Sequence, residues 1–155
     1  MNPARSAKPP AIVHPKTQRL YDYWDSRRGG RRFPSRADID PLDFVFALGN
    51  VILVDVEHER NEFRYRLVGT NCVTRSGYDP TGKTTAAVPG EENRRIVEER
   101  FRAVTRTGEP SVRVRETVTD DRLYVYEVMI LPLGAHDRVD QIMIYLNYDF
   151  ADQRR

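Results

Sequence analysis

The chain has 155 residues, of which 39% are hydrophobic and 31% charged, and these proportions are typical of one soluble globular domain. No apolar run approaches the ~20 residues that a membrane-spanning helix needs, and residues 1–15 lack the apolar segment of a secretory signal. The single cysteine, Cys72, excludes an internal disulfide framework and fits a reducing compartment. The sequence therefore predicts a cytoplasmic protein.

Positive charge is concentrated near the N-terminus. Residues 1–36 hold nine Lys or Arg against two Asp or Glu, although the whole chain has a net charge of only +2. The stretch RRGGRR (27–32) is similar to an Arg-Gly RNA-binding segment, but a capped helix end explains a single copy, so we do not expect nucleic-acid binding. Residues 1–13 are expected to form a disordered arm and residues 151–155 a tail.

A first helix is expected from Thr17, because Leu20, Tyr21 and Trp24 fall on one helical face. Gly29 supplies a left-handed cap after the arginines of the last turn, which suit the negative end of a helix. This apolar helix can cover a sheet within its own chain or across a dimer.

A second helix start lies in the motif DPLDF. Asp40 can cap the helix, and Pro41 fits its first position. We expect Phe44, Val45 and Leu48 to face the core from this helix.

The period of the sequence changes after these helices, and two strands are predicted at residues 51–57 and 62–69, joined by the polar turn HERN. The second strand alternates apolar side chains with arginines, so one of its faces should contact solvent: Phe63, Arg64, Tyr65, Arg66 and Leu67. Residues 70–90 are rich in Gly, Thr and Pro and have room for short helical turns only.

A long helix and three strands complete the chain. The helix at residues 91–107 presents Val97, Phe101 and Val104 as its buried stripe. Hairpin-length links predict antiparallel pairing of the last strands, at residues 111–119, 123–133 and 139–150. The sequence thus predicts an α+β fold: a five-stranded antiparallel sheet with helices on one face and an N-terminal helix, in a single domain at residues 14–150.

The segment GYDPTGKT (77–84) matches the pattern of a phosphate-binding loop. Such a loop follows a buried parallel strand and opens directly into a long helix. Here the preceding strand ends near Gly69, Pro80 removes one backbone N–H, and Pro89 breaks the chain shortly after the motif. We interpret the match as a turn, and nucleotide binding at 77–84 is the weaker alternative.

Glu127 interrupts an otherwise apolar strand, LYVYEVMIL. A core-facing carboxyl would have a raised pKa or a fixed partner and would mark a pocket, in which a small enzyme with a cone-like α+β cavity could use it as an acid or base. The interpretation that we favour places Glu127 on the outer face, paired with Arg113 or Arg115 of the neighbouring strand.

Cofactor signals are weak. The motif GTNC (69–72) is similar to the start of the photoreactive cysteine motif of flavin-binding blue-light receptors, but the following residues differ, so we interpret Cys72 as a half-buried thiol. His14, His58 and His136 have no metal-ligand spacing. We expect no metal and neither flavin nor haem, and the sequence identifies no other cofactor.

Several segments together resemble a known family. LYDYWDSRRGGRRFPSRADIDPLDF, VILVDVE, FRYRLVGT and GYDPTGKT resemble the short, stand-alone PAS domain proteins common in alphaproteobacteria, over about residues 17–150. The most specific parts are PSRADIDP, FRYRLVGT and DPTGK. The resemblance implies a PAS fold and a non-enzymatic sensory or protein-interaction module of bacterial signalling.

The resemblance also implies how the module works. PAS domains hold a small ligand between sheet and helices, or dimerise through the sheet and an N-terminal helix. We therefore expect a homodimer that acts through an unknown signalling partner protein. A small-molecule site should use side chains of the sheet and the long helix: Tyr65, Leu67, Phe101, Tyr126 and Ile144.

Overall fold

The computed structural model describes residues 9–119 and 121–150, whose five strands form one antiparallel sheet in the order β2-β1-β5-β4-β3. The strands are β1 (Val51–Glu57), β2 (Glu62–Val68), β3 (Ser111–Thr119), β4 (Arg122–Ala135) and β5 (Arg138–Asn147). The predicted α+β fold is confirmed. The predicted C-terminal tail and most of the predicted disordered arm lie outside the described residues.

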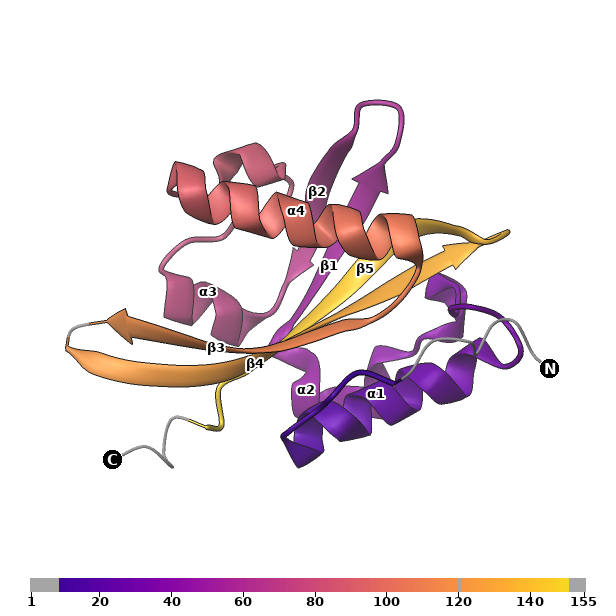
Figure 1. Cartoon of the computed structure of the whole chain (residues 1–155), viewed down its shortest axis with the longest axis horizontal. Coiled ribbons are helices and arrows are strands. Elements are labelled where there is room, and N and C mark those ends of the chain that lie inside the picture. Colours follow the sequence, from indigo (N-terminus) through magenta and orange to yellow (C-terminus); the bar gives the residue numbers. More distant parts are fainter. Residues whose placement is uncertain (1–8, 120, 151–155) are drawn as a thin grey trace.

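Helices lie on both faces of the sheet (Figure 1). α1 (Pro15–Arg28) lies against one face, and α3 (Thr70–Ser76) and α4 (Glu91–Thr107) lie against the other. We call these the α1 face and the α4 face. The N-terminal helix that the sequence predicts is therefore the cover of the second face, and it covers that face within its own chain.

α4 has the predicted bounds and buries the predicted stripe. Phe101 and Val104 are buried and Val97 is partly buried. The ring of Phe101 meets that of Phe63 in β2 edge-on, with the ring centroids 5.5 Å apart. Gly108 caps the helix with a φ of 68°, a left-handed conformation that favours glycine.

α1 begins at Pro15, two residues before the expected start, because His14 caps it: the Nδ1 atom of His14 accepts from Lys16 N at 3.1 Å. The apolar face of the helix is buried as predicted, with Leu20 and Trp24 both 0% exposed. The indole Nε1 of Trp24 also donates to the carbonyl oxygen of Pro132 in β4 at 3.0 Å. Packing and this hydrogen bond together fix α1 on the sheet.

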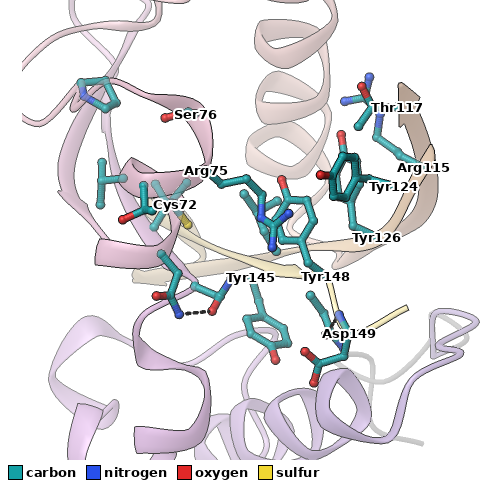
Figure 2. Close-up of a pocket in the computed structure, with 18 of the residues that line it drawn as sticks. Cys72, Arg75, Ser76, Arg115, Thr117, Tyr124, Tyr126, Tyr145, Tyr148 and Asp149 are labelled. Atoms are coloured by element: carbon teal, nitrogen blue, oxygen red, sulfur yellow. Dashed lines mark hydrogen bonds between the residues drawn. The ribbon is translucent and has the colours of Figure 1, made fainter. Parts of the chain in front are cut away.

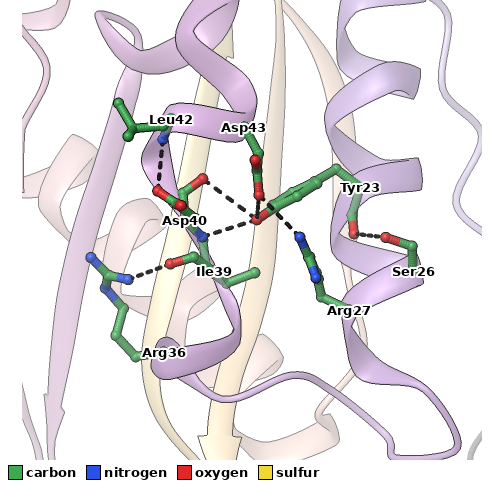
Figure 3. A network of polar contacts seen from close by, with 8 residues as sticks. All are labelled: Tyr23, Ser26, Arg27, Arg36, Ile39, Asp40, Leu42 and Asp43. Atoms are coloured by element: carbon green, nitrogen blue, oxygen red, sulfur yellow. Dashed lines mark hydrogen bonds and ion pairs between the residues drawn. The ribbon is translucent and has the colours of Figure 1, made fainter.

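A polar network ties α1 to the segment that leads into the sheet (Figure 3). The hydroxyl of Tyr23 accepts from Asp40 N at 2.9 Å and donates to Asp43 Oδ2 at 2.8 Å, while Arg27 pairs with the same carboxylate at 3.1 Å. Asp40 in turn accepts from Leu42 N at 3.0 Å, the capping contact expected from the motif DPLDF. These contacts join two segments that the sequence analysis treated separately.

The predicted second helix is split into two short turns. η3 (Pro41–Phe44) is a 3₁₀-helix and α2 (Val45–Leu48) is one turn of α-helix; a third short turn, η2 (Arg36–Asp38), precedes them. Phe44 is buried, but Val45 is 64% exposed, so its predicted inward orientation is wrong. The non-helical backbone of Phe44, with φ −136° and ψ 46°, reorients the turn that follows.

A β-bulge in β2 changes which side chains face the two sides of the sheet. Tyr65 pairs with Val54 of β1, but Leu67 pairs with the adjacent Leu53, so Arg66 is the extra residue. Because neighbouring residues of β1 point to opposite faces, Tyr65 points to the α4 face and Leu67 to the α1 face. The predicted alternation is therefore wrong at Leu67.

None of the helices within the described ranges has the length and the apolar composition that crossing a membrane requires.

Candidate functional site

A cleft opens on the α4 face between α3, the first turn of α4 and the outer parts of β3, β4 and β5 (Figure 2). It reaches round the end of β5 to the start of α1, where Lys16 lines it. Its volume is about 960 Å³, near the upper end of the range for small-molecule sites. The cleft is therefore large enough for a ligand of drug or metabolite size.

Backbone contact between two glycines positions α3 beside this cleft. Gly69 N donates to Val51 O at 2.9 Å, and α3 begins at the next residue. A Cβ atom on Gly69 would lie 2.3 Å from the carbonyl oxygen of Gly49, so only glycine permits this approach. α3 consequently turns back over the sheet and places its side chains in the cleft wall.

Tyrosines dominate the lining. The chain has eight tyrosines, and six of them line the cleft: Tyr65, Tyr78, Tyr124, Tyr126, Tyr145 and Tyr148. Among the described residues, no hydrogen bond joins any of these six hydroxyls to another protein group. Burial, with smaller contributions from neighbouring charges, raises the pKa of both Tyr145 and Tyr148 to about 12, so these hydroxyls stay protonated at neutral pH.

The tyrosine rings form a stack with a guanidinium. The rings of Tyr126 and Tyr148 lie 4.7 Å apart at an interplanar angle of 23°. Arg75 of α3 reaches across the cleft, and its guanidinium carbon lies 3.8 Å from the centre of the Tyr148 ring and 5.6 Å from that of Tyr124 (Figure 2). Stacking on tyrosine leaves the edge donors of the guanidinium available.

Cys72 lies in the same wall, one turn before Arg75. The side chain is 6% exposed, so the thiol is more deeply buried than the half-buried thiol that the sequence predicts. Burial raises the pKa of the thiol to about 11, and the nearby charge of Arg75 only partly offsets this effect. The thiol is therefore protonated, and a poor nucleophile, at neutral pH.

Glu127 lies outside the cleft, and both interpretations of it need correction. It is 0% exposed on the α1 face, where its carboxylate accepts from Val13 N at 2.7 Å and His14 N at 3.2 Å. The favoured pairing with Arg113 or Arg115 is wrong, because Glu127 stands opposite Val114 in the register and both arginines point to the other face. The carboxyl also faces backbone donors of the chain rather than a polar pocket, which removes the basis for an enzyme built on it.

The structure brings together only some of the five predicted site residues. Tyr65 and Tyr126 both line the cleft. Phe101 and Ile144 are buried in the core beneath the same face, at 5% and 3% exposure, and do not line the cleft. The bulge puts Leu67 on the α1 face, where it lines a separate apolar groove of about 460 Å³ with Phe44 and Leu53.

Four further side chains define the cleft and were not predicted from the sequence: Arg75, Arg115, Tyr124 and Tyr148. A signal for two of them was present, because Tyr124 alternates with Tyr126 in β4 and Arg115 lies directly opposite Tyr126 in the register. Nothing local marks Arg75 or Tyr148, which meet the others only through the packing of α3 and the turn after β5.

The phosphate-loop match is a turn that pairs with the edge of β2. Gly82 N donates to Tyr65 O at 2.7 Å, Tyr65 N donates to Lys83 O at 2.9 Å, and Lys83 N donates to Pro80 O at 2.8 Å. The helix behind the motif, η4 (Thr85–Ala87), has three residues. Two N–H groups that would bind phosphate are thus already used, and η4 is too short for a helix dipole, so the geometry does not support nucleotide binding.

Within residues 9–119 and 121–150, no three His, Cys, Asp or Glu side chains lie close enough together to hold a metal ion. The two described histidines with polar contacts serve the backbone: His14 caps α1, and His58 Nε2 lies 2.7 Å from Val139 O.

Comparison with known proteins identifies the family. A PAS domain family model matches residues 12–145, and the chain therefore belongs to the PAS domain family. The PAS domain of BvgS from Bordetella pertussis has a similar solved structure, with a TM-score of 0.53 and 20% identity over 71% of this chain and 87% of that one. A search among curated proteins finds no match.

Two further solved structures are similar at lower scores. A domain of an HTR-like protein from Haloarcula marismortui has a TM-score of 0.42 and 17% identity, over 63% of this chain and 93% of that one. A LOV protein from Rhodobacter sphaeroides has a TM-score of 0.43 and 18% identity, over 62% of this chain and 57% of that one. PAS domains are typically non-enzymatic sensory or interaction modules that commonly dimerise, and this is the class of protein to which the chain belongs.

Proposed function

We propose that the chain is a non-enzymatic sensory PAS module of the cytoplasm, which binds a small molecule in the tyrosine-lined cleft and acts on a signalling partner protein. One observation carries the proposal: the cleft is lined by α3, the first turn of α4 and all five strands at once. A ligand that contacts all of them changes the relative stability of their arrangements. Tyr65 and Tyr126, predicted as ligand-binding residues, are among the contacts that such a ligand would make.

Native mass spectrometry of freshly purified protein, combined with an absorption spectrum, tests whether a small molecule is bound. We expect a mass above that of the bare chain under gentle conditions, and a return to the bare mass when the sample is activated by collisions. A bare mass for every charge state, together with a melting temperature that no small-molecule screen raises, would contradict the proposal.

A homodimer is the second part of the proposal. The β3–β4 hairpin extends past α1 (Figure 1), and its α1 face carries exposed apolar side chains: Val114, Val118 and Leu123 are 47%, 68% and 42% exposed. Val118 stands opposite Leu123 in the register, and Val114 lies on the same face four residues earlier. Exposed apolar side chains of this kind, interrupted on β3 only by Glu116, favour a protein partner, and we propose a second copy of the chain.

Size-exclusion chromatography with light scattering tests this surface. We expect a dimer at micromolar concentration and a shift to monomer in Val118→Lys. Val45→Lys is the matched control, because Val45 is equally exposed at 64% but lies in α2, outside the strip. A wild-type monomer, or equal effects of the two variants, would contradict the proposed dimer without affecting the proposal that the cleft binds a ligand.

A further inference from the structure

We infer that the ligand of the cleft is a planar aromatic carboxylate, an inference that rests on the proposed function of the cleft. The end of the cleft that Arg75 and Arg115 line offers cations, hydroxyl donors and ring faces, and each of these complements a flat anion.

Arginines gather at one end of the cleft. Arg75 and Arg115 line it, and Arg113 lies two residues before Arg115 on the same face of β3. Arg100 of α4 is close to both β3 arginines: the pKa of its guanidinium is lowered by burial and then by the charges of Arg113 and Arg115. Four positive charges on three elements therefore lie near one another.

No carboxylate in the described part of the chain is seen in an ion pair with this cluster. The ion pairs found there, with N–O distances of 4.0 Å or less, include none of the four arginines. Glu116 also lines the cleft, but its position in β3 places it on the face opposite to Arg113 and Arg115. Glu99, whose negative charge raises the pKa of Arg100, is paired with Arg95 at 3.2 Å. Asp149 lines the opposite end of the cleft and is paired with Lys16 at 2.6 Å. A like-charge cluster without a counter-ion is an anion-binding arrangement.

The hydroxyls add donors of the right polarity. A protonated phenol can donate to a carboxylate oxygen, and the raised pKa of Tyr148, which lies beside Arg75, keeps that proton in place far above neutral pH. A cationic ligand would be repelled by the arginines, and a purely apolar ligand would leave the guanidinium and hydroxyl donors without hydrogen-bond acceptors.

The rings select a flat molecule. Arg75 lies over the Tyr148 ring and near the Tyr124 ring, so the slot between α3 and the β3–β4 hairpin already holds one planar group (Figure 2). An aromatic ring stacked on these tyrosines can direct its carboxylate to the donor edge of Arg75 or Arg115, a bidentate geometry that guanidinium and carboxylate share.

Isothermal titration calorimetry with 2-naphthoate as the probe tests this inference. We expect 2-naphthoate to bind, its neutral isostere 2-naphthamide to bind at least tenfold more weakly, and the non-aromatic anion cyclohexanecarboxylate to bind at least tenfold more weakly. In the double variant Arg75→Gln/Arg115→Gln, the Kd for 2-naphthoate should rise at least tenfold. Arg60→Gln, in the exposed β1–β2 turn, is the matched control and should leave the Kd unchanged.

The results of these experiments distinguish a wrong ligand class from a cleft that binds no ligand. Equal binding of the amide and the carboxylate, or an unchanged Kd in the double variant with an unchanged melting temperature, would overturn the aromatic anion and leave a ligand-binding cleft. Failure of 2-naphthoate to bind overturns the ligand class as well. The proposed function itself falls only if native mass spectrometry and the small-molecule screen also find nothing bound.

Discussion

The two faces of the sheet treat their polar groups in opposite ways. On the α1 face three buried polar side chains are hydrogen-bonded: Glu127 binds two backbone N–H groups, and Asn147 donates to Thr17 Oγ1 at 3.2 Å. On the α4 face, the tyrosine hydroxyls and the guanidiniums of Arg75 and Arg115 line an open cleft without such partners in the described chain. A buried polar group costs free energy unless it is paired, so the first arrangement fixes a structure.

The contrast indicates different roles for the two faces. α1 is held in one register by contacts that only one position of the helix satisfies, whereas the cleft keeps its donors available to a molecule that arrives from outside. Substitutions on the α1 face should therefore change stability, and substitutions in the cleft should change binding. The following predictions would break or sharpen this division, starting with the largest expected effect.

Trp24→Ala should destabilise the fold by about 3–5 kcal/mol, because it removes a fully buried aromatic side chain and its hydrogen bond to Pro132. Tyr124→Ala removes a half-buried aromatic residue from the cleft and should cost only about 1 kcal/mol. Urea unfolding followed by circular dichroism measures both. Equal losses would show that the cleft wall is as structural as α1.

Glu127→Ala should cost about 3 kcal/mol, because it removes the buried acceptor of two part-buried hydrogen bonds, from Val13 N and His14 N. Glu127→Gln keeps one acceptor oxygen and should cost about half as much. Hydrogen exchange of residues 13–20 should accelerate in both variants. The control is Glu109→Ala, an exposed carboxylate outside the sheet, and comparable losses there would refute the anchoring role.

The cleft wall should weaken the fold at alkaline pH through Cys72. Since burial raises the thiol pKa from 9.0 to about 11, the stabilisation is fully present below pH 9 and is lost as pH rises towards 11. By a pH of about 10.5 the loss should reach about 2 kcal/mol, from 1.36 kcal/mol per pKa unit. The free energy of unfolding of the Cys72→Ala variant should fall less than that of the wild type over this pH range, by that amount. Parallel stability curves for the two proteins would argue against a buried thiol.

The smallest effect is expected for Arg115→Gln, which should change stability by no more than about 0.5 kcal/mol. Its sign is informative: removal of one charge from the arginine cluster should stabilise the protein slightly at low ionic strength, and salt should abolish the gain. A clear loss of stability would mean that Arg115 has a structural partner.

The element order and the main strand and helix bounds followed from the sequence because they depend on local periodicity. The helix at Glu91–Thr107 shows this well, since its apolar spacing and its glycine cap are both local signals. The orientation of Glu127 was missed because strand parity depends on register, which the sequence alone left open. The cleft was half missed because Arg75 and Tyr148 lie 73 positions apart and meet only through tertiary packing.

The bulge at Arg66 shifts the alternation of side chains along β2 by one residue. Before the bulge, the odd-numbered Phe63 and Tyr65 point to the α4 face. After the bulge, the odd-numbered Leu67 points to the α1 face instead. Deleting Arg66 would restore simple alternation and leave Leu67 and Val68 on their present faces, because Tyr65 would still pair with Val54 and Leu67 with Leu53. A gap of one residue at this point in an alignment would thus mark relatives with a regular β2 strand and with the same side chains facing the groove and the cleft.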